Sequence, residues 1–538
     1  MKVKILLFIL TSLIVCFQNN PLLATIYYIA KTGNDNNPGT ETEPWQTISK
    51  ANTTLRPGDT VYIRAGTYEE TIKPSRSGTE GNYLTYKAYE GETVKITNIS
   101  NGVELDNKCY VIIDRINIIN IERKFIYIWG SGAHHNIVQN CYMDGNTSGH
   151  GWGSVHIHGG STYNKILNNT IKNGHGDVVY ITKESCYNLV QGNEIDGRGC
   201  GHATLSIRGF EGDKVMAGYN IIKNKIIHGG SDDNLHPSQW TEHNFFDGNI
   251  MHTTTIEPGS GYKACGGYYN VVRNNIAYDN VGYGFGIYTN LYTPASPEAK
   301  GNIFYNNVSY DNGGGGDNMH SGFRLVVYKG GLPLHHTIVI NNIIYKNFKE
   351  MYLTVANHDK SKYYNNIFQR NNIFHNNPGD KTIKYFETMY SLVEMESNYP
   401  NEFKDNLEVD PLFVDAKNYD FHLLPNSQMI DAGRYLTFTT SSGSGTKIYV
   451  ENANFFCDGF GLIEGDLIQL EGQTDRAKIT KVDYDNNTLT LNTTLTWYSG
   501  QGVSLAYNGS APDIGAFEYA SAPDTTPPSP PTRLRIIE

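Results

Sequence analysis

The chain has 538 residues, of which 39% are hydrophobic, 18% charged and 12% aromatic. Its 55 Gly and 38 Tyr residues and its low charge exclude a coiled coil and argue against disorder. The formal net charge is −11, so the chain lacks the basic surface that phosphate binding requires, and we expect no nucleic-acid partner.

Residues 1–24 predict a secretory signal peptide. A basic start, Met1 to Lys4, precedes the apolar run from Ile5 to Val15, and the small residue Ala24 marks the expected cleavage point. No later segment reaches the about 18 apolar residues that a membrane helix needs. We therefore expect a secreted protein, extracellular or periplasmic, that has no membrane span and acts as a monomer. The later cysteines show no CxxC spacing and are expected to be buried single thiols.

An Asn-centred repeat dominates the middle of the chain. Its copies follow one another at intervals of 24–32 residues, a period typical of solenoids. They read NIVQNC from Asn136, NKILNN from Asn164, NLVQGN from Asn188, NIIKNK from Asn220, NFFDGN from Asn244, NVVRNN from Asn270 and NIFYNN from Asn302. Short β-branched runs between Gly and Asn leave no room for helices. The pattern predicts an all-β fold, a right-handed parallel β-helix of three short strands per coil in which the Asn side chains form a ladder.

The sequence pattern changes twice after the repeats, first to an alternating segment and then to a Pro-rich tail. A Ser-Gly run at 441–445 opens a segment of alternating apolar and polar residues, which predicts antiparallel hairpins. The predicted organisation is therefore a signal peptide at 1–24, a β-helix at 25–440, an inserted small β-module at 441–510, a final β-helix strand at 511–520 and a Pro-rich tail at 521–538.

Histidine gathers in one part of the chain. Of 17 histidines, 11 lie between His134 and His252, and imidazoles titrate near neutral pH and bind ligands. Aligning the coils on inward-facing apolar residues predicts two outward rows on one face. The first row is His156, Tyr180, Ser206 and His236, and the second is His158, Thr182, Arg208 and Ser238. Lys183 follows the second row, and the loops before the strands carry His175, His202, Asp177, Asp232 and Asp233. Cations and imidazoles crowded on one face favour an anionic ligand.

Residues 27–70, from YYIAKTG to GDTVYIRAGTYEE, resemble the N-terminal segment of carbohydrate-active right-handed parallel β-helix proteins, which include pectate lyases, alginate lyases and chondroitinase B. The segment reads as a first strand, a helix that caps the open end of the solenoid, and the first coil. PLFVD at 411–415 and PDIGAFEY at 512–519 are also similar to this group. The resemblance implies a polysaccharide partner but leaves the substrate open, because the fold hosts many activities.

The stretch VVYITKESCYNLVQGN, followed by HATLSIRGFEGD, resembles chondroitinase B and related alginate lyases, in which a Lys and an Arg on successive coils carry out the elimination. Lys183 and Arg208 match those positions. The resemblance implies a lyase acting on a uronic-acid polysaccharide, with Lys183 as base and Arg208 on the carboxylate. Substrate-binding residues would be His156, His158, His175, Tyr180, His202 and His236. The resemblance also implies Ca²⁺, although Gly176 and Val178 replace the paired glutamates that would hold it, so the metal ligands stay unknown.

Two other functions remain open. A glycoside hydrolase would use a pair of carboxylates, drawn from Asp177, Asp232 and Asp233. The GHG at 174–176 is similar to one in polygalacturonases, but its order relative to the Asp pair is reversed, which argues against direct homology. A non-catalytic, adhesin-like solenoid would bind glycans through the outward Tyr and Asn side chains of the late coils.

Overall fold

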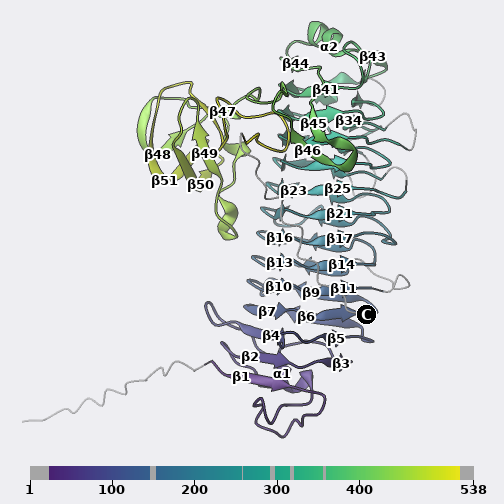
Figure 1. Cartoon of the computed structure of the whole chain (residues 1–538), viewed down its shortest axis with the longest axis vertical. Helices are drawn as coiled ribbons and strands as arrows, with labels where there is room; N and C mark the ends of the chain where they lie inside the picture. The colour runs from purple at the N-terminus through teal and green to yellow at the C-terminus, as the bar shows by residue number, and fades with distance from the viewer. Residues whose placement is uncertain are drawn as a thin grey trace, which may run out of the picture.

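The computed structural model describes residues 24–145, 153–256, 259–290, 297–314, 320–355 and 359–520. The predicted tail at 521–538 lies outside this part of the chain, and so do residues 1–23 of the predicted signal peptide. The described residues form a long solenoid of short strands, with a separate antiparallel sheet beside it (Figure 1). They include no helix with the length and apolar character needed to cross a bilayer. None of the six cysteines after Cys16 forms a disulfide within the described residues; five are buried, as predicted, and Cys109 is half-buried.

Three long sheets, here called A, B and C, run along the solenoid, and each coil adds one strand to each sheet. Sheet A consists of β1 (Ile26–Ile29), β2 (Thr60–Ile63), β4 (Leu84–Ala88), β7 (Val111–Asp114), β10 (Ile137–Gln139), β13 (Lys165–Leu167), β16 (Leu189–Gln191), β20 (Ile221–Lys223), β24 (Phe245–Asp247), β28 (Val271–Arg273), β32 (Ile303–Tyr305), β36 (Ile338–Ile340), β40 (Ile367–Gln369) and β44 (Phe403–Lys404). Sheet B consists of β3 (Gly66–Tyr68), β5 (Val94–Ile96), β8 (Asn117–Ile119), β11 (Tyr142–Asp144), β14 (Thr170–Lys172), β17 (Glu194–Asp196), β21 (Ile226–His228), β25 (Ile250–His252), β29 (Ile276–Tyr278), β33 (Val308–Tyr310), β37 (Ile343–Tyr345) and β41 (Asn372–Phe374).

Sheet C carries the predicted outward rows. It consists of β6 (Asn101–Asp106), β9 (Lys124–Trp129), β12 (Val155–His158), β15 (Val179–Thr182), β18 (Leu205–Arg208), β22 (Leu235–Pro237), β26 (Tyr262–Cys265), β30 (Phe285–Thr289), β34 (Phe323–Val327), β38 (Met351–Val355), β42 (Ile383–Tyr385) and β43 (Thr388–Tyr390), the last of which pairs antiparallel. A shorter parallel sheet joins the later coils and consists of β19 (Ala217–Gly218), β23 (Thr241–Glu242), β27 (Gly267–Tyr268), β31 (Ala299–Lys300), β35 (Leu334–His335) and β39 (Tyr363–Tyr364).

The solenoid is filled by inward side chains from all three long sheets. Val155 and Ile157 of β12, for example, are fully buried, because alternate residues of a strand point to opposite faces. One continuous apolar core runs from Ile29 to Phe403. Helix α1 (Ile48–Thr54) caps its N-terminal end, as predicted from the sequence.

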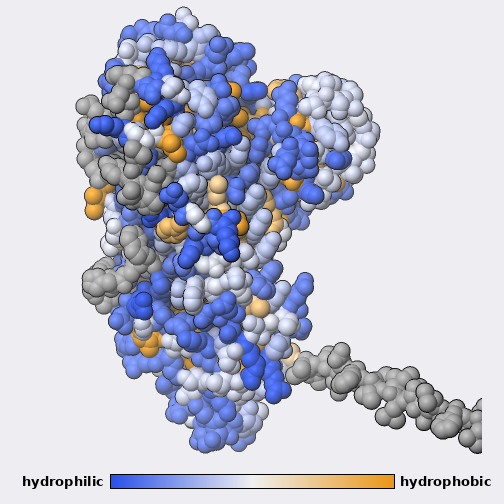
Figure 2. Space-filling view, turned by 180° about the vertical axis from the view of Figure 1, so that it is seen from behind, coloured by the Kyte–Doolittle hydropathy of each residue, from blue (hydrophilic) through white to orange (hydrophobic). Residues whose placement is uncertain are grey.

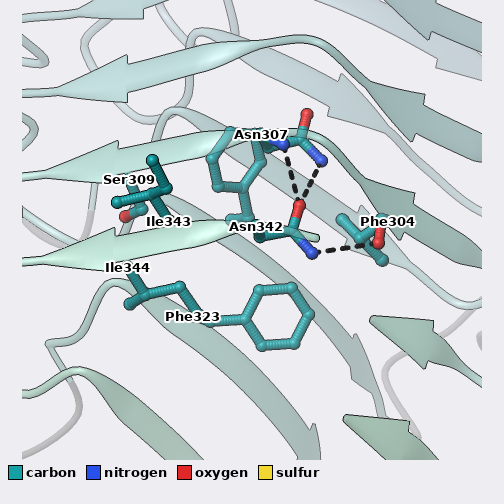
Figure 3. Close-up of a pocket in the computed structure, with 8 residues that line it drawn as sticks. Phe304, Asn307, Ser309, Phe323, Asn342, Ile343 and Ile344 are labelled. Carbon is teal, nitrogen blue, oxygen red and sulfur yellow. Dashed lines mark hydrogen bonds between the residues drawn. The ribbon is translucent and has the colours of Figure 1, made fainter. Parts of the chain in front are cut away.

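Asn side chains stack along the interior, as the repeat predicted. From Asn136 to Asn270, each Nδ2 in the first ladder donates to the Oδ1 of the Asn on the next coil, at 2.9–3.2 Å. This ladder contains Asn136, Asn164, Asn188, Asn220, Asn244, Asn270 and Asn302. Figure 3 shows a rung of a second ladder, in which Asn307 donates to Asn342 Oδ1 at 2.8 Å and Asn342 donates to the carbonyl oxygen of Phe304 at 3.1 Å. These amides satisfy buried backbone groups at the turns between strands.

Lys225 interrupts the second ladder. It precedes Ile226, which pairs with Glu194 and Ile250, so it occupies the position held by Asn193 and Asn249 on the adjacent coils. Lys225 is 1% exposed, and neither its Nζ nor Asn249 Oδ1 has a hydrogen-bond partner among the described residues. Burial lowers the pKa of Lys225 well below its usual value.

The C-terminal end of the predicted β-helix differs from expectation. The parallel coils end at β44 rather than at residue 440, because β43 turns back antiparallel and α2 (Leu392–Asn398) covers the open end. Helix α2 begins with a capping box formed by Ser391 and Glu394. Strands β45 (Phe413–Asp415) and β46 (Asp420–Leu423) form a hairpin after it. The structure includes the short 3₁₀ turns η2 (Lys360–Lys362), η3 (Ala416–Asn418), η4 (Ala453–Phe455) and η5 (Gly459–Gly461).

Residues 511–520 form no strand, in contrast to the prediction. Ile514 is fully buried in a satellite core with Val308 and Ile343, on the outer face of sheet B. The Gly515 amide donates to the carbonyl oxygen of Asn341 at 2.9 Å. The segment covers an apolar outer surface instead of extending a sheet.

The predicted antiparallel segment forms a six-stranded sheet, here called the β-module. It consists of β47 (Thr437–Phe438), β48 (Gly443–Tyr449), β49 (Leu467–Leu470), β50 (Arg476–Asp483), β51 (Thr488–Trp497) and β52 (Gly502–Leu505). Figures 1 and 2 show it projecting from one side of the solenoid. It shares an apolar core with Ile221 and Phe245 of sheet A, and Arg273 makes a bidentate pair with Asp466 at 2.6 Å.

We expect Lys225→Asn to stabilise the fold by about 1–3 kcal/mol, because the substitution removes an unpaired buried amine and supplies a donor to Asn249. The measurement is the midpoint of thermal or urea unfolding. The gain should shrink as the pH rises toward about 10, because the wild-type Lys225 must release a proton on folding at lower pH. Lys95→Asn, at an exposed lysine of sheet B, is the matched control and should change stability by less than about 0.5 kcal/mol. An unchanged or lower midpoint for Lys225→Asn would contradict this account of the ladder.

Candidate functional site

The outward rows on sheet C have the predicted register. His156 pairs with Tyr180, and Tyr180 with Ser206, which in turn pairs with His236. In the second row Thr182 lies between His158 and Arg208. The rows therefore bring residues from four successive coils onto one face.

Two histidines of these rows share one hydroxyl. Thr182 Oγ1 lies 3.1 Å from His156 Nε2 and 2.7 Å from His158 Nδ1, and the His156 ring stacks on Tyr180 at 5.2 Å. Burial, followed by the charge of Lys124, lowers the pKa of His156 to about 2. Burial and the charge of Lys183 also lower the pKa of His158. Both imidazoles are neutral at pH 7, so they add no positive charge to this face, in contrast to the expectation from sequence.

Asp177 organises the loop before β18. Its Oδ1 accepts hydrogen bonds from Ser206 Oγ at 2.8 Å and from the amide of Ala203 at 3.1 Å, and it lies 2.7 Å from His202 Nδ1. Burial disfavours a charged His202, but the hydrogen bond and charge of Asp177 outweigh burial and raise the pKa of His202. His175, in the loop before β15, is buried, and its amide donates to Ser154 Oγ at 2.7 Å.

A buried ion cluster lies one coil further on. Lys263 Nζ is 2.8 Å from Asp233 and 3.2 Å from Asp232, and His236 Nδ1 is 2.8 Å from Asp233. The attraction of Asp233 outweighs burial and holds the pKa of Lys263 well above its usual value. Lys263 and His236 likewise hold the pKa of Asp233 at about 2 against the effect of burial. Burial lowers the pKa of His236, which is neutral. The His202 ring lies 5.3 Å from the His236 ring, so the two clusters are contiguous.

Lys183 and Arg208 lie side by side on the exposed face. The Lys183 amide donates to the carbonyl oxygen of Arg208 at 3.1 Å, and its side chain is exposed after a turn with a left-handed φ of 51°. Arg208 is half-buried, with its guanidinium 5.1 Å from the Phe210 ring and Nη2 3.4 Å from Gln239 Oε1. Neither side chain enters the coil, which is the geometry predicted for this pair.

Two lysines of this region were missed by sequence reasoning. Lys263 follows Tyr262, which pairs with Leu235, so it continues the row after His236. Extending the alignment across one more coil would have found it. Lys124, at the start of β9, donates to the Gly153 carbonyl oxygen at 3.2 Å. Burial and then the charge of Arg123 lower the pKa of Lys124 to about 8. The adjacent Arg123 is visible in the sequence, but the burial that is the larger cause is not.

The residues present do not fit the implied calcium site. Asp177, which stands between Gly176 and Val178, is already bound to an imidazole and a hydroxyl group, and Asp233 on a later coil is bound to an ammonium group. Over the described ranges, no group of three His, Cys, Asp or Glu side chains is placed to hold a metal ion.

The three acids of the hydrolase alternative do not provide one protonated and one ionised carboxyl group. A glycosidase needs one carboxyl that stays protonated to act as the acid. Asp233 is fully buried and ionised beside Lys263, Asp177 is 2% exposed and fully engaged, and only Asp232 reaches solvent. This arrangement gives no acid and base pair among them.

The comparisons with known proteins agree with this architecture. Residues 27–322, more than half of the chain, match the family model described as Pel9A-like, right handed beta helix region. The uncharacterized protein YwoF of Bacillus subtilis (strain 168) is 25% identical over 489 residues, which cover 78% of this chain and 96% of that protein. Pectate lyase PEL9 of Emericella nidulans is 39% identical over 86 residues, 16% of this chain and 20% of that protein. The structure of the PL6 family alginate lyase AlyGC has a TM-score of 0.51 at 18% identity, over 67% of this chain and 50% of that chain, and shares the fold. The chain therefore belongs to the Pel9A-like family of right-handed parallel β-helix proteins. This family agrees with the right-handed β-helix predicted from the sequence.

Proposed function

We propose that the protein is a polysaccharide lyase that cleaves a uronic-acid polysaccharide by β-elimination. Membership of the Pel9A-like family supports action on a polysaccharide. The observation that carries the finer proposal is the adjacent placement of Lys183, directly after β15, and Arg208, at the end of β18, on the outer face of sheet C. An exposed base and a guanidinium on one face suit a substrate that carries a carboxylate next to a removable proton.

The proposed chemistry assigns each group one task. The proton on the carbon next to the carboxylate is weakly acidic, so Arg208 binds the carboxylate and stabilises the negative charge that develops on it. Lys183, in its neutral form, removes that proton. The electron pair forms the carbon–carbon double bond as the bond to the glycosidic oxygen breaks, and that oxygen takes up a proton. The products are an unsaturated sugar and a new reducing end.

Lys124 is the second candidate for the base, and one observation favours it. Its pKa of about 8 leaves a substantial neutral fraction near physiological pH. It lies on the same side of sheet C, near enough to His156 and His158 for its charge to lower the pKa of both. Lys263 is a poorer base, because its two carboxylate partners hold it in the charged form.

The first substrate to test is pectate. A pectate lyase, PEL9, shares 39% identity with an 86-residue stretch of this chain. We expect pectate to give both new absorbance from the double bond and new reducing ends, measured on the same samples. Alginate and a neutral galactan serve as comparison substrates. Reducing ends without double-bond absorbance would indicate hydrolysis, and neither signal on any anionic polysaccharide would contradict the proposed function.

Variants of the two proposed catalytic residues should lose activity without losing the fold. We expect Lys183→Ala to lower kcat by about 10²-fold or more, because the base is removed. Arg208→Lys should lower kcat/KM by about 10²-fold, because a point charge replaces the planar fork on the carboxylate. Circular dichroism checks the fold, and Lys95→Ala on sheet B is the matched control. Full activity of Lys183→Ala would remove Lys183 from the mechanism.

The pH dependence distinguishes the two lysines. If Lys124 is the base, kcat should rise with pH and level off above about 8, because the base acts only after losing its proton. Lys124→Ala would then abolish the elimination, whereas Lys183→Ala would keep it. Loss of activity in Lys183→Ala together with an active Lys124→Ala variant would assign the base to Lys183.

A further inference from the structure

A second cleft lies away from the rows on sheet C, between the solenoid and the β-module. Its volume is about 480 Å³, within the range of ligand-binding pockets. Tyr163, Tyr187 and Tyr219 of the solenoid form one wall, and Asp458, Phe460 and Tyr484 of the β-module face them. None of these residues belongs to the candidate site on sheet C.

The solenoid wall is a regular row of phenol rings. Each ring residue directly precedes an Asn of the first ladder and has a left-handed φ of 56–57°, so the three side chains leave successive coils at the same turn. The Tyr163 and Tyr187 rings stack at 5.2 Å, and the Tyr187 and Tyr219 rings at 5.1 Å. Within the described chain, none of the three phenol oxygens is hydrogen-bonded to another residue. The coil spacing thus presents one free hydroxyl per rung.

The opposite wall is held rigidly in place. Phe460 lies in the 3₁₀ turn η5 with a left-handed φ of 51°, and its ring meets Tyr219 edge-on at 5.3 Å. The Asp458 carboxylate accepts from the amides of Phe460 and Val482, both at 3.0 Å. Lys165 Nζ donates to the carbonyl oxygen of Leu462 at 3.0 Å. These contacts join η5 to both the module and the solenoid, so the cleft exists before any ligand arrives.

The charge around the cleft is negative. After burial, the charges of Glu242 and Asp485 contribute to raising the pKa of Tyr219 to about 12, and those of Glu242 and Asp458 contribute at Tyr187. Asp458 lines the cleft, whereas no Lys or Arg is among its lining residues, and the Lys165 ammonium group points to the backbone carbonyl of Leu462. A carboxylate ligand would therefore be repelled here, whereas a neutral polyhydroxylated ligand would not.

We propose that this cleft binds a neutral polysaccharide chain. Tyrosine combines an apolar ring with a hydroxyl that both donates and accepts, which suits the mixed apolar and hydroxyl surface of a sugar. The ring spacing of 5.1–5.2 Å is close to the advance per residue of an extended pyranose chain, so successive sugars meet successive hydroxyls. The site would hold the protein on a neutral component of the same polysaccharide mixture. The proposal goes beyond the elimination and does not depend on it.

The test uses the full chain and titration calorimetry with hexasaccharides of galactan, xylan and cellulose, and with hexagalacturonate as the anionic comparison. Thr480→Trp fills the cleft from the exposed side of β50, and Thr494→Trp places the same ring on exposed β51, away from the cleft. We expect at least one neutral hexasaccharide to bind, with a tenfold or greater loss in Thr480→Trp and no loss in Thr494→Trp. Tyr187→Phe, which removes one hydroxyl, should weaken binding about fivefold.

Three outcomes would overturn the proposal. They are no binding of any neutral hexasaccharide, equal binding by Thr480→Trp and the wild type, and loss of neutral binding in Arg208→Lys, which would move that binding to sheet C. Elimination of a short soluble uronate oligosaccharide should be unchanged in Thr480→Trp. That assay reports on the proposed lyase separately, so failure of one proposal does not imply failure of the other.

Discussion

The stacking of successive coils is the constraint on which the rest of the structure depends. Each strand pairs in parallel with its counterpart one coil away, and the Asn ladders satisfy the buried backbone groups at the turns between strands. Because the side-chain period of a strand is two residues, this register decides which side chains leave the core. It sets the rows of sheet C and, through the residue before each ladder Asn, the row of phenol rings as well.

Stacking also determines the electrostatics of the candidate site. A histidine between two coils of aromatic neighbours is desolvated, which is why His156 is neutral at pH 7 although it lies on an outward row. Lys263 is desolvated too, but two carboxylates from the previous coil keep it charged. The same face therefore combines neutral imidazoles with an ammonium group whose charge two carboxylates compensate, and its positive charge without a carboxylate partner comes from Lys183 and Arg208. The elimination that we propose needs a cation for the carboxylate, the role given to Arg208, and a nearby base that has lost its proton.

Much of this arrangement could be predicted from the sequence, because the Asn repeat supplies an alignment of the coils. The repeat predicted the ladder, the outward rows and the neighbouring positions of Lys183 and Arg208. The sequence also contains the capping-box pattern at Ser391 and Glu394, which indicates the start of a helix. It likewise contains the Lys at position 225 where the repeat has Asn. Burial was not predictable in this way. The shifted pKa values of His156 and Lys124 depend on which side chains cover them, and these come from other coils.

The β-module could be located from sequence, but its role in the architecture could not. Alternating apolar and polar residues predicted its hairpins. The apolar outer side chains of sheet A that it covers, such as Ile221 and Phe245, have no sequence feature that distinguishes them from other strand residues. The buried pair of Arg273 and Asp466 joins residues 193 positions apart in the chain, and no local pattern predicts such a contact. Once docked, the module turns one part of the aromatic row into the wall of an open cleft. A repeated fold thereby gains a local site without any change in its repeat, because the added element supplies the second wall.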